Sequence, residues 1–391
     1  MKQQLKIFLT VLMISILYGT EVDLFIPSFP DIQKTFALSP FLVQLTLSIN
    51  YIAYAACAIF AGSLGDRFNR RLVILYSLGV FVVGSICCVC AFHFSLLVFG
   101  RFLQGIGIAG PAVLAFVVIS DTYPRQKQIA VLGLLSGVVT IAMAFAPVIG
   151  SYVNLYFNWR ANFIILLIVG ILSFIISYMY IPDHAGDESI SLSPKAYLPL
   201  LKSSKVMAFI MSLTLTGVAY WAFIGMAPIL YMDGLGVELK NFGYYQGAIS
   251  LAFGIVSLLS PRIINILGLK NSLHYSLVGC FLTSLLIVVI ATLGINSPLM
   301  ITAAMVLFSI FVVFPVQIMF PEALHIVPNT KARVSALMNS LRLILTAGVL
   351  EVISYFYTGD FFLLGITTAM LMLISLFLIV YILNKKWMHF E

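Results

Sequence analysis

Charged residues are scarce in this sequence. Lys, Arg, Asp and Glu make up 9% of its 391 residues, whereas soluble globular domains carry about 25%. Hydrophobic residues make up 62% of the chain, so a soluble fold would lack the polar side chains needed to cover its surface. The shortage of charge excludes a soluble globular protein and predicts an integral membrane protein.

Signals of several other functional classes are missing. The sequence has no G-x-x-x-x-G-K-S/T loop, so it does not predict direct use of ATP. Its five cysteines lie inside apolar runs without zinc-site spacing, which favours buried thiols, and no nucleophile constellation is recognisable. We therefore expect no enzyme activity and no cofactor. The net charge is +7, but the basic residues are dispersed, which argues against a nucleic-acid partner.

Twelve apolar runs are long enough to cross a bilayer, which takes about 20 residues of helix. They lie near 7–27, 41–62, 72–92, 96–119, 128–150, 160–181, 206–231, 242–261, 271–293, 298–320, 334–356 and 362–383. The first run has no small-residue cleavage site after it, so we expect a retained span and not a removed signal peptide. The pattern predicts an all-α integral membrane fold.

The basic residues predict the orientation. With a cytoplasmic N-terminus, 16 of the 21 Lys and Arg residues lie in cytoplasmic segments, three lie outside and two lie within spans. This bias places both termini in the cytoplasm. The longest polar loop, 182–205, falls near the midpoint of the chain. It predicts two six-helix bundles, residues 1–181 and 206–391, joined by a cytoplasmic linker.

The cytoplasmic loop GSLGDRFNRR at 62–71 has two interpretations. It is either a basic anchor with a glycine turn or a functional signature, because it resembles the G-x-L-x-D-R-x-G-R-R signature of the major facilitator superfamily. Asn69 stands where that family prefers glycine, and Asn also tolerates left-handed turns. RFLQGIG at 101–107 resembles the family's span-four motif, and AFAPVIGSY at 144–152 resembles the span-five motif of its proton antiporters.

Three further stretches resemble the Bcr/CflA drug-resistance branch of that family: DLFIPSFPDI (23–32), NWRANF (158–163) and MAPILYMDGLGVELKNFGYYQG (226–247). The resemblance implies a monomeric multi-pass protein of the bacterial inner membrane, driven by the proton gradient. It also implies a charge relay at the signature loop, formed by Asp66 and Arg67 with Asp121 as partner. Gating roles are expected for Gly62, Asp66, Arg67, Arg70, Arg71, Asp121, Pro147 and Gly150.

Five ionisable residues lie within the predicted spans: Glu21, Asp23, Arg101, Arg342 and Glu351. Each costs about 2.5–3.5 kcal/mol on insertion scales, which makes each a functional candidate. At 1.5 Å per helical residue, Asp23 and Arg101 reach a similar depth near the outer face, and Glu351 a similar level. Arg342 lies lower, which favours a gating or structural role.

An acid and an arginine at one depth suggest a proton switch. Arg101 would hold ionised Asp23 and release it on protonation, with Gln104 shaping the site by family resemblance. Pro27 has no N–H to donate to the Asp23 carbonyl and permits a kink there. The alternative is a permanent ion pair that joins two helices. Glu21 points about 200° away on a helix, so it is either a second titrating group or faces a neighbour or lipid; Glu351 is equally open.

Polar and amphipathic residues on spans that line the cavity in this family are candidates for substrate contact, and helix packing is the alternative for each. They are Asn50, Tyr54, Gln104, Met143, Tyr220, Trp221, Phe223, Gln246, Gln317 and Asn339. Such an adaptable lining suits amphipathic, lipophilic or cationic molecules.

The sequence thus predicts a proton-coupled antiporter that exports small amphipathic molecules by alternating access. A dedicated metabolite or siderophore exporter and a proton-coupled uptake symporter remain alternatives. A membrane sensor or scaffold is a third, although the longest loop is too short for a signalling domain.

Overall fold

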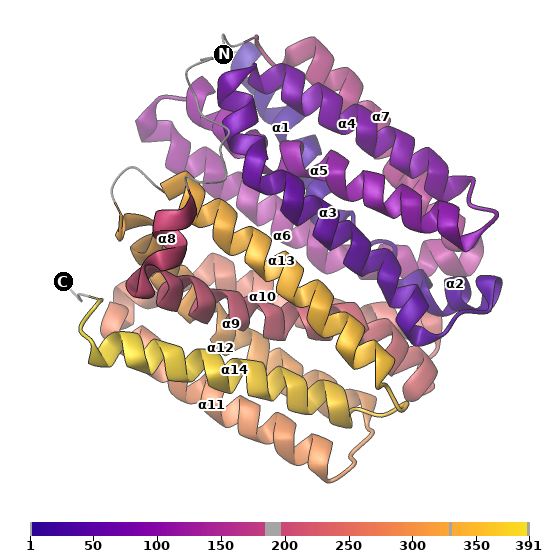
Figure 1. Cartoon of the computed structure of the whole chain (residues 1–391), viewed down its shortest axis with the longest axis vertical. Coiled ribbons are helices and arrows are strands. Elements are labelled where there is room, and N and C mark those ends of the chain that lie inside the picture. Colours follow the sequence, from indigo (N-terminus) through magenta and orange to yellow (C-terminus); the bar gives the residue numbers. More distant parts are fainter. Residues whose placement is uncertain (1, 184–196, 328–330, 389–391) are drawn as a thin grey trace. The chain divides into compact units, whose positions relative to one another are not determined.

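The computed structural model describes residues 2–183, 197–327 and 331–388 (Figure 1). The regular structure of these residues is helical, and 12 of their helices are long and apolar enough to cross a membrane. This confirms the predicted all-α fold with twelve spans. The chain divides into two compact units, Met1–Ser193 and Pro194–Glu391.

The first unit contains six of the spanning helices. Its elements are α1 (Lys2–Thr20), η1 (Ile26–Ser28), α2 (Phe29–Phe36), α3 (Pro40–Arg67), α4 (Arg70–Val89), α5 (Phe94–Thr122), α6 (Arg125–Tyr156) and α7 (Trp159–Tyr180). Helix α5 packs against α1, α3, α4 and α6. It is therefore the helix on which side chains from several others can converge.

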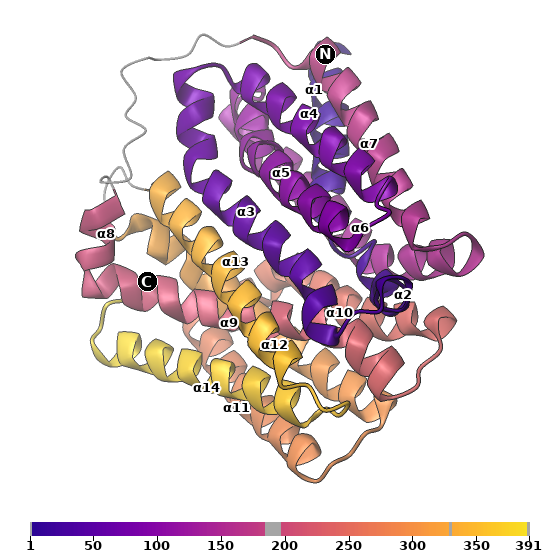
Figure 2. The same cartoon turned by 45° about the vertical axis from the view of Figure 1, so that its right-hand side comes forward.

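The second unit contains the other six. Its elements are α8 (Leu198–Lys202), α9 (Ser204–Pro228), η3 (Ile229–Gly234), α10 (Leu239–Leu267), α11 (Leu269–Thr292), α12 (Pro298–His325), α13 (Lys331–Tyr355) and α14 (Phe362–Asn384). Helix α9 packs against α12, α13 and α14 (Figure 2). Of the predicted linker 182–205, residues 184–196 lie outside the described part, and α8 occupies part of the rest.

The first span ends earlier than the sequence predicts. Helix α1 stops at Thr20, and the chain passes through a turn before η1 begins at Ile26. The N–H groups of Glu21 and Leu24 still donate to carbonyls four residues back, at 3.0 Å each. Pro27 cannot continue this series, because it has no N–H to donate to the Asp23 carbonyl. The acids of this segment consequently lie on a turn and not on a helix.

The fifth span extends further than predicted. Helix α6 continues through Pro147 to Tyr156, six residues past the predicted end at 150. The Ser151 hydroxyl donates to the Pro147 carbonyl at 2.8 Å, one turn further along the same helix. Pro147 therefore does not end the helix.

Candidate functional site

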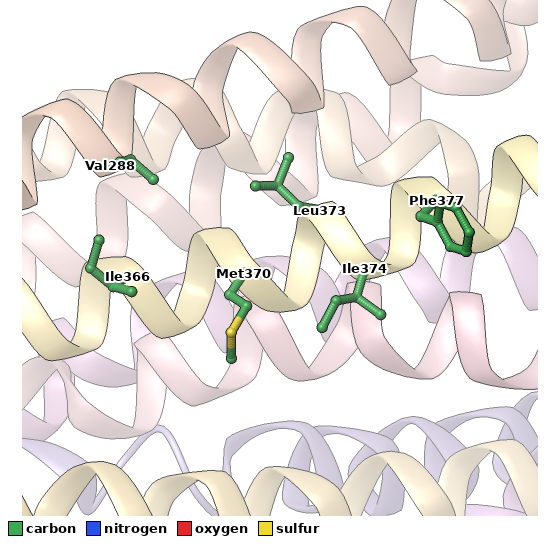
Figure 3. A pocket seen from close by; sticks show the side chains of 6 residues that line it. All are labelled: Val288, Ile366, Met370, Leu373, Ile374 and Phe377. Carbon is green, nitrogen blue, oxygen red and sulfur yellow. The ribbon is translucent and has the colours of Figure 1, made fainter.

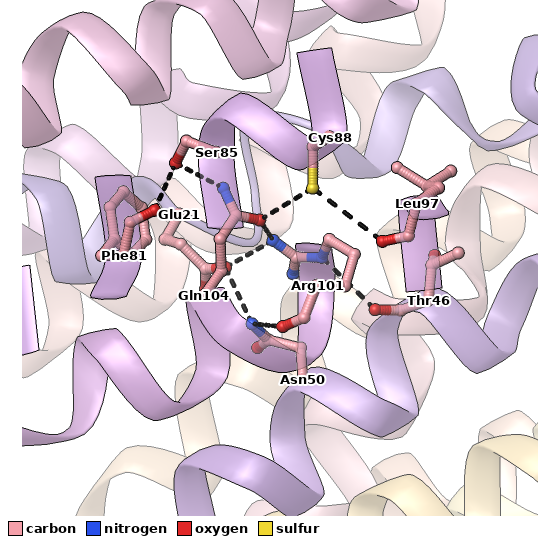
Figure 4. Close-up of polar contacts among 9 residues, drawn as sticks. All are labelled: Glu21, Thr46, Asn50, Phe81, Ser85, Cys88, Leu97, Arg101 and Gln104. Atoms are coloured by element: carbon pink, nitrogen blue, oxygen red, sulfur yellow. Dashed lines mark hydrogen bonds and ion pairs between the residues drawn. The ribbon is translucent and has the colours of Figure 1, made fainter. Parts of the chain in front are cut away.

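A buried polar cluster lies inside the first unit (Figure 4). We call Glu21, Asn50, Arg101 and Gln104 the Arg101 cluster. Glu21 is 2% exposed and the other three are fully buried. They come from three elements: the turn after α1, helix α3 and helix α5. An arginine and a carboxylate so deeply enclosed need each other, because an isolated buried charge is unfavourable.

Local sequence features bring these side chains together. Arg101 and Gln104 are three residues apart and so share one face of α5. Gly105 follows them, and a methyl group at that position would collide with the Asn50 carbonyl oxygen. Only glycine lets the backbones of α3 and α5 approach this closely. The close approach places the Asn50 amide beside Arg101.

The Arg101 guanidinium is bonded on several sides. Its Nη1 donates to Glu21 Oε1 at 2.5 Å and to Gln104 Oε1 at 2.6 Å, and its Nε donates to the Thr46 carbonyl at 3.3 Å. The Asn50 amide donates to the same Glu21 oxygen at 3.0 Å. The guanidinium carbon also lies 4.2 Å from the Phe25 ring centre. These bonds offset the loss of hydration that a buried ion pair suffers.

Helix α4 supports the cluster from behind. Gln104 Nε2 donates to the Ser85 hydroxyl at 2.8 Å, and that hydroxyl donates to the Phe81 carbonyl at 2.9 Å. The Cys88 thiol lies 3.6 Å from Gln104 Oε1. Thr46, Ser85 and Cys88 were not among the predicted site residues. The available signal was indirect: a buried glutamine such as Gln104 needs partners on the facing helix.

The predicted partner of Arg101 is corrected by the structure. Arg101 pairs with Glu21 and not with Asp23. A helix through residue 27 would turn Glu21 away from Asp23, but the end of α1 at Thr20 lets both side chains turn inward. Glu21 therefore faces an arginine and not lipid. Asp23 is 3% exposed, and its Oδ1 accepts no hydrogen bond from the described residues.

The signature loop is shorter than its sequence suggests. Helix α3 continues through Gly62, which lies beside Val113 of α5, and ends at Arg67. Asn69 caps the next helix, because its side chain accepts a hydrogen bond from the Arg71 N–H at 2.9 Å. Its φ of 166° is extended and not left-handed. The expected left-handed turn is thus replaced by a helix cap, a role in which asparagine is favoured.

The arginines of this loop have separate partners. Arg70 forms an ion pair with Asp121 of α5. Arg71 Nη1 pairs with Asp183 at 2.6 Å, and its Nη2 donates to the Tyr178 carbonyl at 2.7 Å. Asp121 thus pairs with a different arginine from the expected Arg67, whose guanidinium carbon lies 5.6 Å from the Phe68 ring centre. The Asp66 side chain lies outside the described part of the structure.

Helix α6 contacts the acid-bearing turn through its backbone. A methyl group at Gly150 would collide with the Leu24 carbonyl oxygen. The Asn162 amide of α7 donates to the Gly150 carbonyl at 3.1 Å and to the Ser28 hydroxyl at 2.9 Å. Gly150 is thus a packing position that joins α6 to the residues next to Asp23.

In the second unit, four residues of α9 and α13 form what we call the Arg342 cluster: Gly217, Trp221, Asn339 and Arg342. Arg342 Nη2 donates to Asn339 Oδ1 at 2.7 Å. Its guanidinium carbon lies 5.6 Å from the Trp221 ring centre, within cation–π range. Tyr220 stacks on Phe253 of α10 at 4.9 Å and meets Trp221 edge-on at 5.4 Å.

The other predicted contact residues are scattered. Gln246 is fully buried, and neither of its amide atoms has a hydrogen-bond partner among the described residues. Phe223 is also fully buried and packs edge-on to Tyr231 and Phe361, which favours the packing alternative. The remaining three contact candidates are Tyr54, buried on α3; Met143, beside Gly19; and Gln317, exposed on α12. Glu351, a candidate for proton coupling, is partly buried on α13.

A groove of about 450 Å³ lies on the second unit between α11 and α14 (Figure 3). Its lining is Val288, Ile366, Met370, Leu373, Ile374 and Phe377. These side chains offer no polar group to orient a ligand, so the groove is not the candidate site. Within the described residues, no group of three or more His, Cys, Asp or Glu could hold a metal ion.

Two six-span helical units with buried charge in the membrane region define a secondary-transporter architecture. The chain belongs to the Major Facilitator Superfamily, whose family model matches residues 11–349. It is 28% identical to a bicyclomycin resistance protein homolog of Haemophilus influenzae over 310 residues, 76% of each chain. It is 30% identical to the multidrug resistance protein MdtL of Salmonella dublin over 275 residues, 69% of each chain.

Solved structures share the fold at low identity. The xylose transporter XylE of E. coli, in a partially occluded inward-open conformation, aligns with a TM-score of 0.75 at 11% identity and covers 98% of each chain. The human organic anion transporter MFSD10 aligns with a TM-score of 0.73 at 15% identity, covering 96% of this chain and 99% of its own. The family assignment, the fold and the prediction that the chain is a transporter and not an enzyme are confirmed.

Proposed function

We propose that this chain exports small amphipathic molecules across the bacterial inner membrane in exchange for protons, with both termini in the cytoplasm. The proposal draws on the drug-resistance names of its relatives. The observation that carries it is Asp23, a carboxyl 3% exposed whose Oδ1 lacks a hydrogen-bond partner among the described residues. Asp23 lies two residues from Glu21, whose carboxylate already forms an ion pair with Arg101.

The two acids have different roles in this proposal. Protonating Glu21 would leave the Arg101 guanidinium buried without a counter-ion, at a cost of about 3–5 kcal/mol. Protonating Asp23 breaks no ion pair, because none joins it to the described residues. Asp23 is therefore the proton carrier, and Glu21 is the fixed counter-ion of Arg101.

The transport cycle uses this difference. A proton entering from outside neutralises Asp23 and removes a negative charge from beside the Glu21–Arg101 pair. The changed charge balance biases the protein toward the state that releases cargo outward. Loss of the Asp23 proton to the cytoplasm restores the state that binds new cargo from the cytoplasm. The chain acts as a monomer and needs no cofactor beyond the proton gradient.

The test is flux into proteoliposomes that hold an acidic interior, with a panel of amphipathic dyes as probes. The unmutated protein should accumulate dye as protons leave, and a protonophore should stop it. Asp23→Asn should abolish this pH-driven flux while the protein still purifies as a folded species. Glu238→Gln, an exposed carboxylate paired with Lys240, is the matched control and should behave as the unmutated protein.

The outcome also separates the rival functions. Unchanged flux in Asp23→Asn would reject proton coupling through this residue. Accumulation of probe in the direction of proton flow would indicate a symporter. Flux of one compound out of a chemically varied panel would indicate a dedicated metabolite or siderophore exporter.

A further inference from the structure

Arg342 has no counter-ion among the residues that the structure describes. It lies nine residues after the start of the span Arg333–Tyr355, well inside the membrane region. Among the residues that the structure describes, no carboxylate lies within ion-pair distance of its guanidinium. A guanidinium stays charged at every physiological pH. The second unit therefore carries an uncompensated positive charge within a spanning helix.

The Arg342 side chain is nevertheless held in place. A methyl group at Gly217 would lie 2.8 Å from Arg342 Cδ, so the arginine stem occupies the space that this glycine leaves free. Trp221, one turn further along α9, lies against the guanidinium, and Asn339 accepts one of its hydrogen bonds at 2.7 Å. The head group is thus oriented by two helices.

Most of the guanidinium's donors stay available. Arg342 is only partly buried, and the Asn339 bond uses one of its five N–H groups. Its remaining nitrogens are not among the enclosed unsatisfied atoms, whereas Arg101 Nη2 is. They are therefore accessible. A planar fork of free donors matches the two oxygens of a carboxylate better than any neutral group.

Aromatic surface adjoins this charge. The Tyr220 ring lies 5.4 Å from Trp221 and 4.9 Å from Phe253, so three rings follow one another from the guanidinium along α9 and α10. Such a surface suits the apolar part of a molecule whose charged end is at Arg342.

We propose that the Arg342 cluster is an anion-binding subsite that takes the carboxylate of an amphipathic organic acid. The inference rests on the proposed transport function, since the bound acid is the cargo. It changes the expected charge of that cargo, because an uncompensated arginine repels the cationic molecules that the sequence also suggested. It further assigns Arg342 to binding, where the sequence favoured gating.

The test is equilibrium dialysis of the full chain in phosphatidylcholine nanodiscs, with empty nanodiscs subtracted. The two probes are 1-naphthylacetate and its neutral amide, 1-naphthylacetamide, which differ at the charged end alone. The unmutated protein should bind the carboxylate about tenfold more tightly than the amide. Arg342→Gln should abolish that preference, and Arg262→Gln, which removes an exposed arginine from the same unit, should retain it.

Arg342→Lys separates binding from folding, because it keeps the charge and loses the planar fork. It should retain part of the carboxylate preference with an unchanged gel-filtration profile. The proposal is overturned if the unmutated protein shows no carboxylate preference, if Arg342→Gln keeps it, or if Arg342→Lys loses it as fully as Arg342→Gln does. The assay uses no pH gradient, so proton coupling can fail without affecting it.

Discussion

The two units each place an arginine within the membrane region, in opposite electrostatic states. Arg101 is fully buried and bonded to Glu21, Gln104 and the Thr46 carbonyl. Arg342 is partly buried and bonded to one neutral amide. The Arg101 guanidinium is neutralised inside the protein and organises the helices around it, whereas Arg342 has no counter-ion among the described residues and is the proposed site for an external anion. The supply of counter-ions, and not the residue type, distinguishes the two sites.

The largest effect on stability is expected when the counter-ion of Arg101 is removed, which makes Arg101 resemble Arg342. Glu21→Gln leaves the guanidinium buried and unpaired, and the free energy of unfolding should fall by about 3–5 kcal/mol. Thermal unfolding in detergent measures the loss. The double variant Glu21→Gln/Arg101→Met removes both charges and should recover much of the stability. A double variant no more stable than Glu21→Gln would show that the pair is not coupled.

Each arginine lies near a glycine, and substituting that glycine tests how tightly the surroundings of the arginine are packed. Gly105→Ala pushes a methyl group into the Asn50 carbonyl, and backbone atoms yield poorly. We expect a loss of about 1–3 kcal/mol in stability. Gly348→Ala, at a helical glycine with nothing within 4 Å of the added methyl, is the control and should not destabilise the protein. Equal melting temperatures for both variants would contradict the close approach of α3 and α5.

Gly217→Ala should have a smaller effect. The added methyl meets Arg342 Cδ at 2.8 Å, and a flexible side chain can move aside. The loss in stability should therefore be about 1 kcal/mol or less. The carboxylate preference in the dialysis assay should fall, because the guanidinium is displaced from Trp221. A preference unchanged by this variant would mean that the orientation of Arg342 does not matter.

The smallest effect is expected at a third arginine, Arg71, the second residue of the span Arg70–Val89. Its partner Asp183 has a side chain that is 66% exposed, so water and salt screen the pair. Asp183→Asn should change stability by about 0.5 kcal/mol or less, and less still at high salt. A loss as large as that of Glu21→Gln would show that burial does not govern these ion pairs.

The spans were predictable from sequence because a bilayer demands long apolar helices and the chain offers twelve. The Arg101–Glu21 ion pair was not predictable from sequence, because it depends on the residue at which α1 ends. Pro27 signals a kink, but the structure ends the helix at Thr20 and so reverses which acid meets the arginine. Ser85 was missed because small hydroxyl residues are common in apolar helices, where they bond to their own backbone. Thr46 was missed because it contributes its backbone carbonyl, which its residue type does not signal.

The contact of Gly150 with the Leu24 carbonyl couples the position of two elements. At Gly150 no side chain separates α6 from the loop that bears Glu21 and Asp23, and the Asn162 amide joins the same region by two hydrogen bonds. A change in the tilt of α6 would therefore also move the segment that bears the two carboxylates. This contact would couple proton uptake to helix movement, and a bulkier residue at position 150 would disrupt the coupling by a steric clash with the Leu24 carbonyl.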